Sequence, residues 1–252
     1  MITVPQIKSK SEDAMTRKYL SFDIETAKIL PQQTRDIHAF RPLGITCAAA
    51  VAHDLEKPFL FFSKTDSGDY APRMTPADLG QMIDFLMEQM AAGYTVLTHN
   101  GLGFDFDILA EETGRLADCS AIAMNHVDTM FHFFCHKGFA VSLKAVAQGL
   151  GIAKTEEEGG AIAPVLWDRG EHERVLRYVA NDCQMALEIA VVSERQGRLK
   201  WVTKKGVTSE LHLKGGWMTV KDAMRLDLPD TSWLENPWPR EKFTGWVTKE
   251  YG

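Results

Sequence analysis

The chain has 252 residues, of which 45% are hydrophobic and 25% charged, and these globular proportions exclude a disordered chain, a collagen-like repeat and a coiled coil. Its net charge is −6, but residues 200–252 carry +2 and residues 1–199 carry −8, so the overall sign does not decide the class of partner. No apolar stretch approaches the roughly 20 residues of a membrane span, no secretory segment is recognisable, and the four cysteines are scattered. We therefore expect a cytoplasmic protein without membrane association, disulfide bonds or a zinc ribbon.

Predicted strands and helices alternate along the chain after a polar, aperiodic tail at residues 1–17. Apolar alternation and short apolar runs predict strands at residues 19–25, 45–52, 58–63, 94–98 and 126–129. Helical periodicity and capping residues predict helices at residues 76–92, at 104–112, from 142 onward and at 171–194. Three strands followed by alternating helices and strands indicate an α/β fold whose sheet has an antiparallel half.

The last part of the chain differs in composition, because residues 200–252 hold five of the six tryptophans. A hairpin is predicted over residues 201–213. A segment of this length would form only a marginal core of its own. We therefore expect residues 18–199 to form the main domain and residues 200–252 to be a C-terminal extension packed on it. Most of its tryptophans are expected to pack rather than to bind a ligand. The basic residues Lys204 and Lys205 suit either a phosphate backbone or a solvated surface.

Two carboxylates stand at the end of the first predicted strand, where Asp23 and Glu25 are two residues apart. Strand side chains alternate between faces, so both carboxylates point the same way, and Phe22 and Ile24 face the opposite, buried side. Adjacent carboxylates repel each other unless a proton or a cation lies between them. Hard divalent cations favour such oxygen-only ligands. A magnesium-type site and two solvated acids are both compatible with this pair alone.

Two further segments carry residues that could contribute to the same site. Asn100 and Phe104 lead into Asp105 at a junction between a predicted strand and a predicted helix, where sites gather in α/β sheets. In the last long helix Tyr178 and Asp182 are four residues apart and therefore lie on one helical face. Asp107 would point elsewhere around its helix, and we expect it at the surface.

Taken together, the segments read Phe-Asp-Ile-Glu-Thr, Asn-x-x-x-Phe-Asp and Tyr-x-x-x-Asp, in that order. This pattern resembles the DEDD superfamily of 3′–5′ exonucleases, in the branch that carries a tyrosine in the third motif. The resemblance covers about residues 18–197 and is closest to stand-alone exonucleases related to the proofreading domains of family B DNA polymerases. The histidine branch would have His at position 177, which is Arg177 here.

The resemblance implies a ribonuclease H-like fold, with a mixed five-stranded sheet flanked by helices. It also implies two divalent cations, Mg²⁺ or Mn²⁺, held by four acids, with Asp23 shared by both ions, Glu25 and Asp182 at one, and Asp105 at the other. Tyr178 would orient the attacking water, and a nucleoside 5′-monophosphate would leave from the 3′ end. The residues that correspond to contacts with the terminal nucleotides are Thr26, Asn100 and Phe104.

Several functions are compatible with this resemblance. A 3′–5′ exonuclease acting on single-stranded DNA is favoured, because no helical RNA-binding domain is recognisable beside the catalytic segment. An RNA 3′-end-processing enzyme like ribonuclease D is the alternative within the branch. A catalytically inactive nucleic-acid-binding module is disfavoured, because all four acids and the tyrosine are present, and a phosphohydrolase acting on free nucleotides is a further alternative. The spacing of His132, Cys135 and His136 suits a transition metal, but their phenylalanine neighbours indicate a packed apolar helix.

Overall fold

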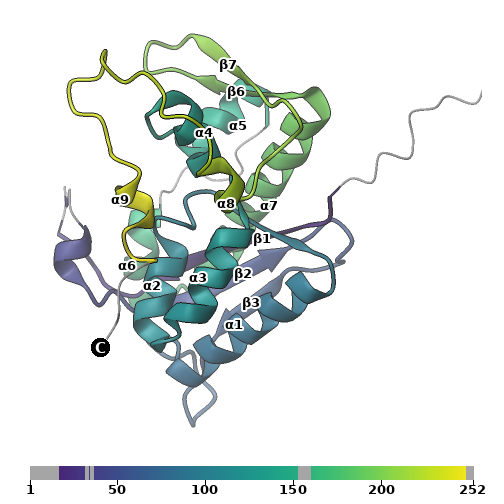
Figure 1. Ribbon diagram of the computed structural model, residues 1–252. Helices are drawn as coiled ribbons and strands as arrows, with labels where there is room; N and C mark the ends of the chain where they lie inside the picture. Colours follow the sequence, from purple (N-terminus) through teal and green to yellow (C-terminus); the bar gives the residue numbers. More distant parts are fainter. Residues whose placement is uncertain (1–16, 32–33, 35–36, 153–159, 248–252) are drawn as a thin grey trace, which may run out of the picture.

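The computed structural model describes residues 17–31, 34, 37–152 and 160–247, so nearly all of the predicted tail at residues 1–17 lies outside the described residues. A five-stranded sheet forms the centre, in the order β3-β2-β1-β4-β5 (Figure 1). Its strands are β1 (Tyr19–Thr26), β2 (Ile45–Val51), β3 (Phe59–Phe62), β4 (Thr95–Thr98) and β5 (Val127–Asp128). β1 pairs antiparallel with β2 and parallel with β4, which confirms the mixed sheet.

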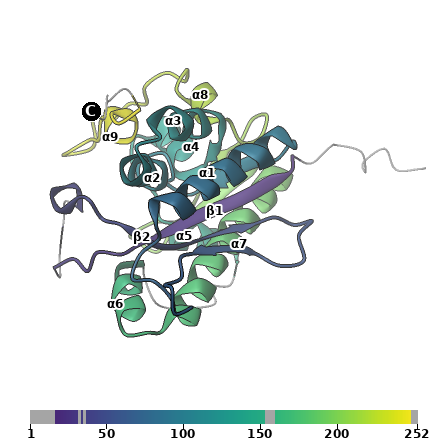
Figure 2. The same ribbon diagram turned by 90° about the horizontal axis from the view of Figure 1, so that it is seen from below.

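Helices cover both faces of this sheet (Figure 2). One face packs against α1 (Pro76–Ala91), α2 (Asp105–Thr113) and α3 (Leu116–Asn125), with part of α4 (Thr129–Lys137). The other face packs against α5 (Leu143–Leu150), α6 (Ala163–Asp168) and the long α7 (His172–Gln196). Two 3₁₀ helices, η1 (Ile37–Phe40) and η2 (Gly160–Ile162), lie in the connections. No helix in the described residues has the length and apolarity needed to cross a bilayer.

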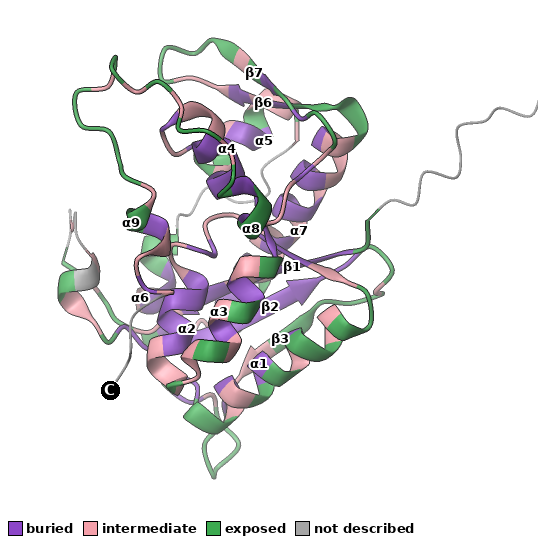
Figure 3. Ribbon diagram, viewed as in Figure 1, coloured by how far each residue is buried: buried purple, intermediate pink, exposed green. Residues whose placement is uncertain are grey.

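Alternation along β1 and β2 divides the core into two layers. Phe22 and Ile24 of β1 face α1 and α2, whereas Cys47 and Ala49 of β2 face α7. These two side chains are small, so α7 can lie close to the strands, and the thiol of Cys183 on α7 lies 3.3 Å from the carbonyl oxygen of Ala49. Figure 3 shows the resulting pattern, with the central strands β1 and β2 largely buried, the edge strand β3 more exposed, and exposed residues along the outer side of α1. All four cysteines are buried and unpaired.

The C-terminal segment packs along the α7 side and the α4 end of the molecule. The predicted hairpin is confirmed as β6 (Arg198–Val202) and β7 (Thr208–His212), and two short helices follow, α8 (Val220–Ala223) and α9 (Glu241–Thr244). The indole N–H of Trp217 donates to the carbonyl oxygen of Ala190 in α7 at 3.0 Å, and that of Trp246 donates to Leu102 at 2.6 Å. Trp201, Trp217 and Trp246 are buried as expected, whereas Trp233 and Trp238 are exposed.

Candidate active site

A cavity of about 400 Å³ opens where β1 ends, between the turn that precedes α2 and the inner face of α7. It brings together residues that are far apart in the sequence, and its polar lining includes Asp23, Glu25, Thr26, His99, Tyr178 and Asp182. Phe104 also lines it. Of the residues expected from the sequence, Asp105 contacts Asp23 beside the cavity, and Asn100 is not part of the lining that the structure describes.

The first two acids are positioned by the pleat of β1. Asp23 pairs with Ala49 of β2 and Glu25 pairs with Cys47, so both carboxylates project from the face that α7 covers. Glu25 is only 6% exposed. The pairing with β2 shifts register between Glu25 and Thr26, and the strand ends there. The two carboxylates therefore lie near the end of a largely buried strand, under α7, and not on a strand end that is surrounded by solvent.

Asp105 reaches the same place from the first turn of α2. The parallel ladder between β1 and β4 ends at the pair Ser21 and Leu97. Beyond it, the backbone N–H of Ile24 donates to Oδ1 of Asp105 at 3.1 Å. Asp105 is 3% exposed and also forms a side-chain hydrogen bond with Asp23. Two carboxyl groups can share a hydrogen bond only when one of them holds a proton.

The remaining two residues come from α7, where a separation of four residues places Tyr178 and Asp182 on one helical face. The hydroxyl of Tyr178 is hydrogen-bonded to the carboxylate of Asp182. Gly160 lies opposite, where a Cβ atom would be 3.8 Å from Oε2 of Glu25 and 3.9 Å from the Tyr178 hydroxyl. The tyrosine hydroxyl and the β1 carboxylates therefore share one small space.

Burial and mutual repulsion dominate the electrostatics of this cavity. Burial, followed by repulsion from the other three acids, raises the pKa of Asp23 well above its usual value. Burial and the charges of Asp182 and Asp105 do the same for the pKa of Glu25, and burial raises the pKa of Asp105 to about 7. The lining that the structure describes contains no Lys or Arg side chain. The negative charge must therefore be offset by protons or by cations from solution.

The model of the RNase_H superfamily matches residues 64–192, which is half of the chain. The chain belongs to the RNase H superfamily. The matched range includes Asp105, Tyr178 and Asp182, while Asp23 and Glu25 precede it. A search of curated proteins found no match. Among solved structures, the chain is similar to a family B DNA polymerase from the hyperthermophilic archaeon Pyrobaculum calidifontis, with 18% identity and a TM-score of 0.49. That similarity covers 70% of this chain and 24% of the polymerase chain, so the protein spans about a quarter of the polymerase's length.

Membership of the RNase H superfamily supports a nuclease-type function, and the acids have the chemistry that a divalent metal ion requires. The donor set consists of carboxylate oxygens, the ligands that Mg²⁺ and Mn²⁺ prefer. As the side chains stand, no group of three or more Asp, Glu, His or Cys residues in the described part of the chain is arranged to hold an ion. Asp105 is turned toward Ile24 and Asp23 instead. The donors therefore fit divalent cations, and binding requires these carboxylates to rotate and to lose the shared proton.

A buried acid, Asp128, stabilises the turn before α2 through hydrogen bonds to its backbone. Asp128 accepts the backbone N–H groups of Asn100, Leu102 and Phe131, each at 2.9 Å, and so supports the turn while it caps α4. Asn100 adopts a φ of 87°, and a Cβ atom at Gly101 would lie 2.5 Å from Thr98 Oγ1. Asn100 thus has a clear role in the turn, and its contact with a nucleotide stays a prediction.

His99 lines the cavity, and we did not expect it there from the sequence. Its Nε2 donates to the carbonyl oxygen of Val141 at 2.9 Å, and its Nδ1 lies 2.8 Å from the hydroxyl of Thr129. Burial lowers its pKa, which favours the neutral ring. It therefore connects the turn before α2 to the segment before α5. Its position directly before Asn100 was the only signal in the sequence.

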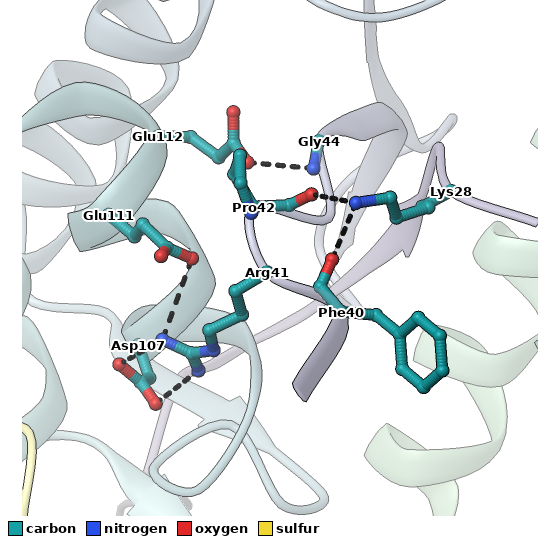
Figure 4. Close-up of polar contacts among 8 residues, drawn as sticks. All are labelled: Lys28, Phe40, Arg41, Pro42, Gly44, Asp107, Glu111 and Glu112. Carbon is teal, nitrogen blue, oxygen red and sulfur yellow. Dashed lines mark hydrogen bonds and ion pairs between the residues drawn. The ribbon is translucent and has the colours of Figure 1, made fainter. Parts of the chain in front are cut away.

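Asp107 is buried, and the expectation that it lies at the surface is wrong. It is 4% exposed and forms a two-point ion pair with Arg41, in which Nη1 lies 3.0 Å from Oδ1 (Figure 4). Arg41 Nη1 also lies 3.6 Å from Glu111, and the backbone N–H of Gly44 donates to Glu112 at 2.7 Å. These three acids of α2 hold the connection between β1 and β2, which contributes Leu30, Ile37 and Leu43 to the cavity lining.

The histidines of α4 belong to a packed helix, as expected. His132 is buried, its Nε2 lies 3.2 Å from that of His136, and its Nδ1 accepts the backbone N–H of Met218 at 3.3 Å. Phe131 and Phe133 on the same helix are fully buried. Because burial lowers the pKa of His132 to about 3, its ring stays neutral at physiological pH and serves the interface with the C-terminal segment.

Proposed function

We propose that the protein is a metal-dependent 3′–5′ exonuclease of the tyrosine-containing DEDD type that acts on single-stranded DNA. The observation that carries this proposal is the meeting of Asp23, Glu25, Asp105 and Asp182 with the Tyr178 hydroxyl at one small cavity. Four acids and a tyrosine from three separate segments converge there, in the chain order of the three sequence motifs. The proposed catalytic domain comprises residues 18–199.

The four acids would hold two divalent cations, Mg²⁺ or Mn²⁺, with Asp23 shared between them, Glu25 and Asp182 at one and Asp105 at the other. When bound, such ions make water a stronger nucleophile and stabilise the charge that develops on a phosphodiester. The repulsion among the carboxylates supports this assignment, because the protein provides no Lys or Arg in the described lining to offset it.

Tyr178 would position the attacking water and would not act as the base. Burial, and next the charge of Asp182, raise the pKa of its hydroxyl further above the usual value of about 10. The hydroxyl therefore stays protonated at neutral pH. Its proton is donated to Asp182, so its oxygen lone pairs remain available to accept a hydrogen bond from water.

The size and lining of the cavity suit a terminal nucleotide. Its volume of about 400 Å³ lies near the lower end of the range for small-ligand sites, which suits one end residue better than an intact duplex. Phe104 supplies a partly buried ring and Thr26 the last residue of β1 at its edge. We propose that these two residues and Asn100 contact the terminal nucleotides.

Oligonucleotides of DNA and RNA, each labelled at either the 5′ or the 3′ end, test the proposal in the presence of Mg²⁺ or Mn²⁺. We expect the 3′ label to leave at once as a nucleoside 5′-monophosphate, while the 5′-labelled strand shortens step by step. Internal cleavage, release from the 5′ end or hydrolysis of free nucleotides alone would contradict it. Faster hydrolysis of the RNA strand would assign the enzyme to RNA 3′ ends instead.

A further inference from the structure

A second, larger cavity lies outside the proposed active site and has a volume of about 840 Å³. Three segments enclose it: the connection between α4 and α5, the β6–β7 hairpin with its turn, and the irregular chain before α9. We call it the Trp groove. Its lining is Gly138, Phe139, Ala140, Val141, Ser142, Ala145, Trp201, Val202, Thr203, Lys204, Lys205, Ser209, Trp233, Leu234, Asn236 and Trp238. A further cavity of about 630 Å³ adjoins it and shares Phe139, Trp201, Ser209 and Trp233.

Two tryptophans of this groove remain accessible in the folded protein. Trp233 is 63% exposed and Trp238 is 43% exposed. The ring of Trp233 is nevertheless held in place. The indole N–H of Trp233 donates to the carbonyl oxygen of Asp230 at 3.0 Å, and its ring meets Phe139 edge to face at a centroid distance of 5.7 Å. An exposed aromatic ring whose orientation is fixed loses little entropy when a flat ligand stacks on it.

Lysines surround these rings. Lys204 and Lys205 lie in the hairpin turn, line the groove, are exposed, and form no ion pair among the described residues. Lys242 lies 3.4 Å above the ring of Trp238 and so covers one of its faces. Lys137 lines the adjoining cavity. Of the acids there, Glu210 is engaged by Arg198 at 3.3 Å, and Asp230 accepts the backbone N–H of Ser232.

The Trp groove lies beside the proposed active site, because one short segment lines both. Val141 and Ser142 line the groove, and Leu143 lines the cavity that holds the acids. Residues two apart are separated by at most about 7 Å along the chain. His99, which lines the acid cavity, is hydrogen-bonded to the carbonyl oxygen of Val141 at 2.9 Å. A strand that left the acid cavity across this segment would reach the groove.

We propose that the Trp groove binds the single strand that leads into the active site, with bases stacked on Trp233 and Trp238 and phosphates near Lys204 and Lys205. This inference rests on the proposed function. The groove suits a single strand because unpaired bases expose their faces for stacking, whereas bases in a duplex are stacked on each other. The cationic rim matches a phosphate backbone and would be unfavourable for a purely apolar ligand.

Fluorescence anisotropy of a 5′-labelled DNA strand of about ten nucleotides, with a chelator present to prevent hydrolysis, measures this binding directly. Alanine substitution of a stacking ring weakens single-strand binding about 5- to 150-fold per base. We expect this loss for Trp233→Leu and recovery of most of the affinity for Trp233→Phe, which keeps a ring. The loss should be larger for this strand than for a trinucleotide, and it should be absent for a duplex of the same length.

Charge reversal tests the phosphate contacts independently of the rings. Lys204→Glu with Lys205→Glu should weaken binding and reduce the slope of log K against log salt by about 0.7 for each phosphate that a lysine no longer neutralises. The matched control is Lys57→Glu with Lys64→Glu, which makes the same change in charge beside β3, at the opposite edge of the molecule from the hairpin (Figure 1). The control should bind as the wild type does. Thermal unfolding confirms that each variant is folded.

The outcomes separate this inference from the proposed function. Equal affinities and salt slopes for wild type and groove variants, or no single-strand binding by the wild type, would overturn the inference and leave the groove to an apolar ligand or a protein segment. Groove-dependent binding without hydrolysis in Mg²⁺ or Mn²⁺ would support the inference and contradict the exonuclease proposal.

Discussion

The backbone N–H of Ile24 and the carboxylate of Asp105 are hydrogen-bonded at 3.1 Å, although they are 81 residues apart. This bond joins the middle strand of the sheet to the first turn of α2. It lies directly beside Asp23, so the backbone that carries the first acid also fixes the position of the third. The placement of Asp105 is therefore a property of the fold, and its charge can be removed without removing its hydrogen bond.

Two substitutions at position 105 separate these contributions. Asp105→Asn and Asp105→Ala both remove the charge, but only asparagine retains an oxygen that can accept the Ile24 N–H. We expect the alanine variant to be less stable than the asparagine variant by about 1–3 kcal/mol, because the buried N–H loses its partner. Urea unfolding of the metal-free proteins measures the difference. Equal free energies of unfolding would show that the hydrogen bond does not position the residue.

Removal of one acid should stabilise the metal-free protein. Burial and repulsion raise the pKa of Asp23 and Glu25 in the fold, and burial raises that of Asp105 to about 7, so the folded state binds more protons than the unfolded one. Stability is then highest below the unfolded carboxyl pKa of about 4 and falls as the pH rises toward about 7.

We expect Asp23→Asn to raise the melting temperature of the metal-free protein at pH 7 and to reduce this loss of stability with rising pH. Mg²⁺ should stabilise the wild type and have a smaller effect on the variant. Nuclease activity should be lost. Melting curves with a chelator and with Mg²⁺, recorded between pH 5 and 8, provide the measurement. A variant that is less stable than wild type at pH 7 would contradict the electrostatic argument.

Tyr178→Phe removes one hydroxyl while its ring still packs against the core. If that hydroxyl orients the attacking water, the turnover number should fall by roughly tenfold to a thousandfold. The Mg²⁺ concentration that gives half-maximal activity should change little, because the four carboxylates remain. Single-turnover kinetics over a Mg²⁺ titration measure both quantities. Wild-type turnover at saturating Mg²⁺ would leave Tyr178 with a packing role alone.

The ion pair of Arg41 and Asp107 should be essential to the connection between β1 and β2. Asp107→Ala leaves a largely buried guanidinium without its closest partner, and loss of one member of a buried pair costs about 3–5 kcal/mol. Arg41→Met with Asp107→Leu replaces the pair by apolar groups and should recover much of that stability. Denaturant unfolding of Arg41→Met, Asp107→Leu and the double variant gives the coupling energy. Independent, additive effects would argue against a structural role for the pair.

Much of the fold and the acid cluster could be predicted from the sequence. The alternation of Phe22, Asp23, Ile24 and Glu25 predicts that the two apolar side chains and the two acids lie on opposite faces of a strand. The four-residue spacing of Tyr178 and Asp182 places both on one side of a helix. These are local rules with fixed periods. They predicted the strands of the sheet and the direction of the acids, although not the hydrogen bond between Asp105 and Asp23.

Contacts between distant segments could not be predicted in the same way. The position of Asp107 on α2 predicts a surface residue. Its burial is made favourable by the ion pair with Arg41, which lies in the connection between β1 and β2. The helix α3 follows α2 after a single glycine turn at Gly114, too short a break for periodicity to resolve. Whether a tryptophan is buried depends on what covers it, so Trp217 and Trp233 look alike in the sequence and differ in the fold.

The burial of all four cysteines makes the protein convenient for chemical labelling. Burial raises the pKa of Cys47, Cys119, Cys135 and Cys183, so few of these thiols are ionised at neutral pH, and none is exposed to a reagent. A cysteine introduced at Lys205 or Leu228, both exposed, would react far faster than the native thiols with a maleimide fluorophore or a crosslinker. Site-specific probes can thus be attached to the native background without first replacing any core residue.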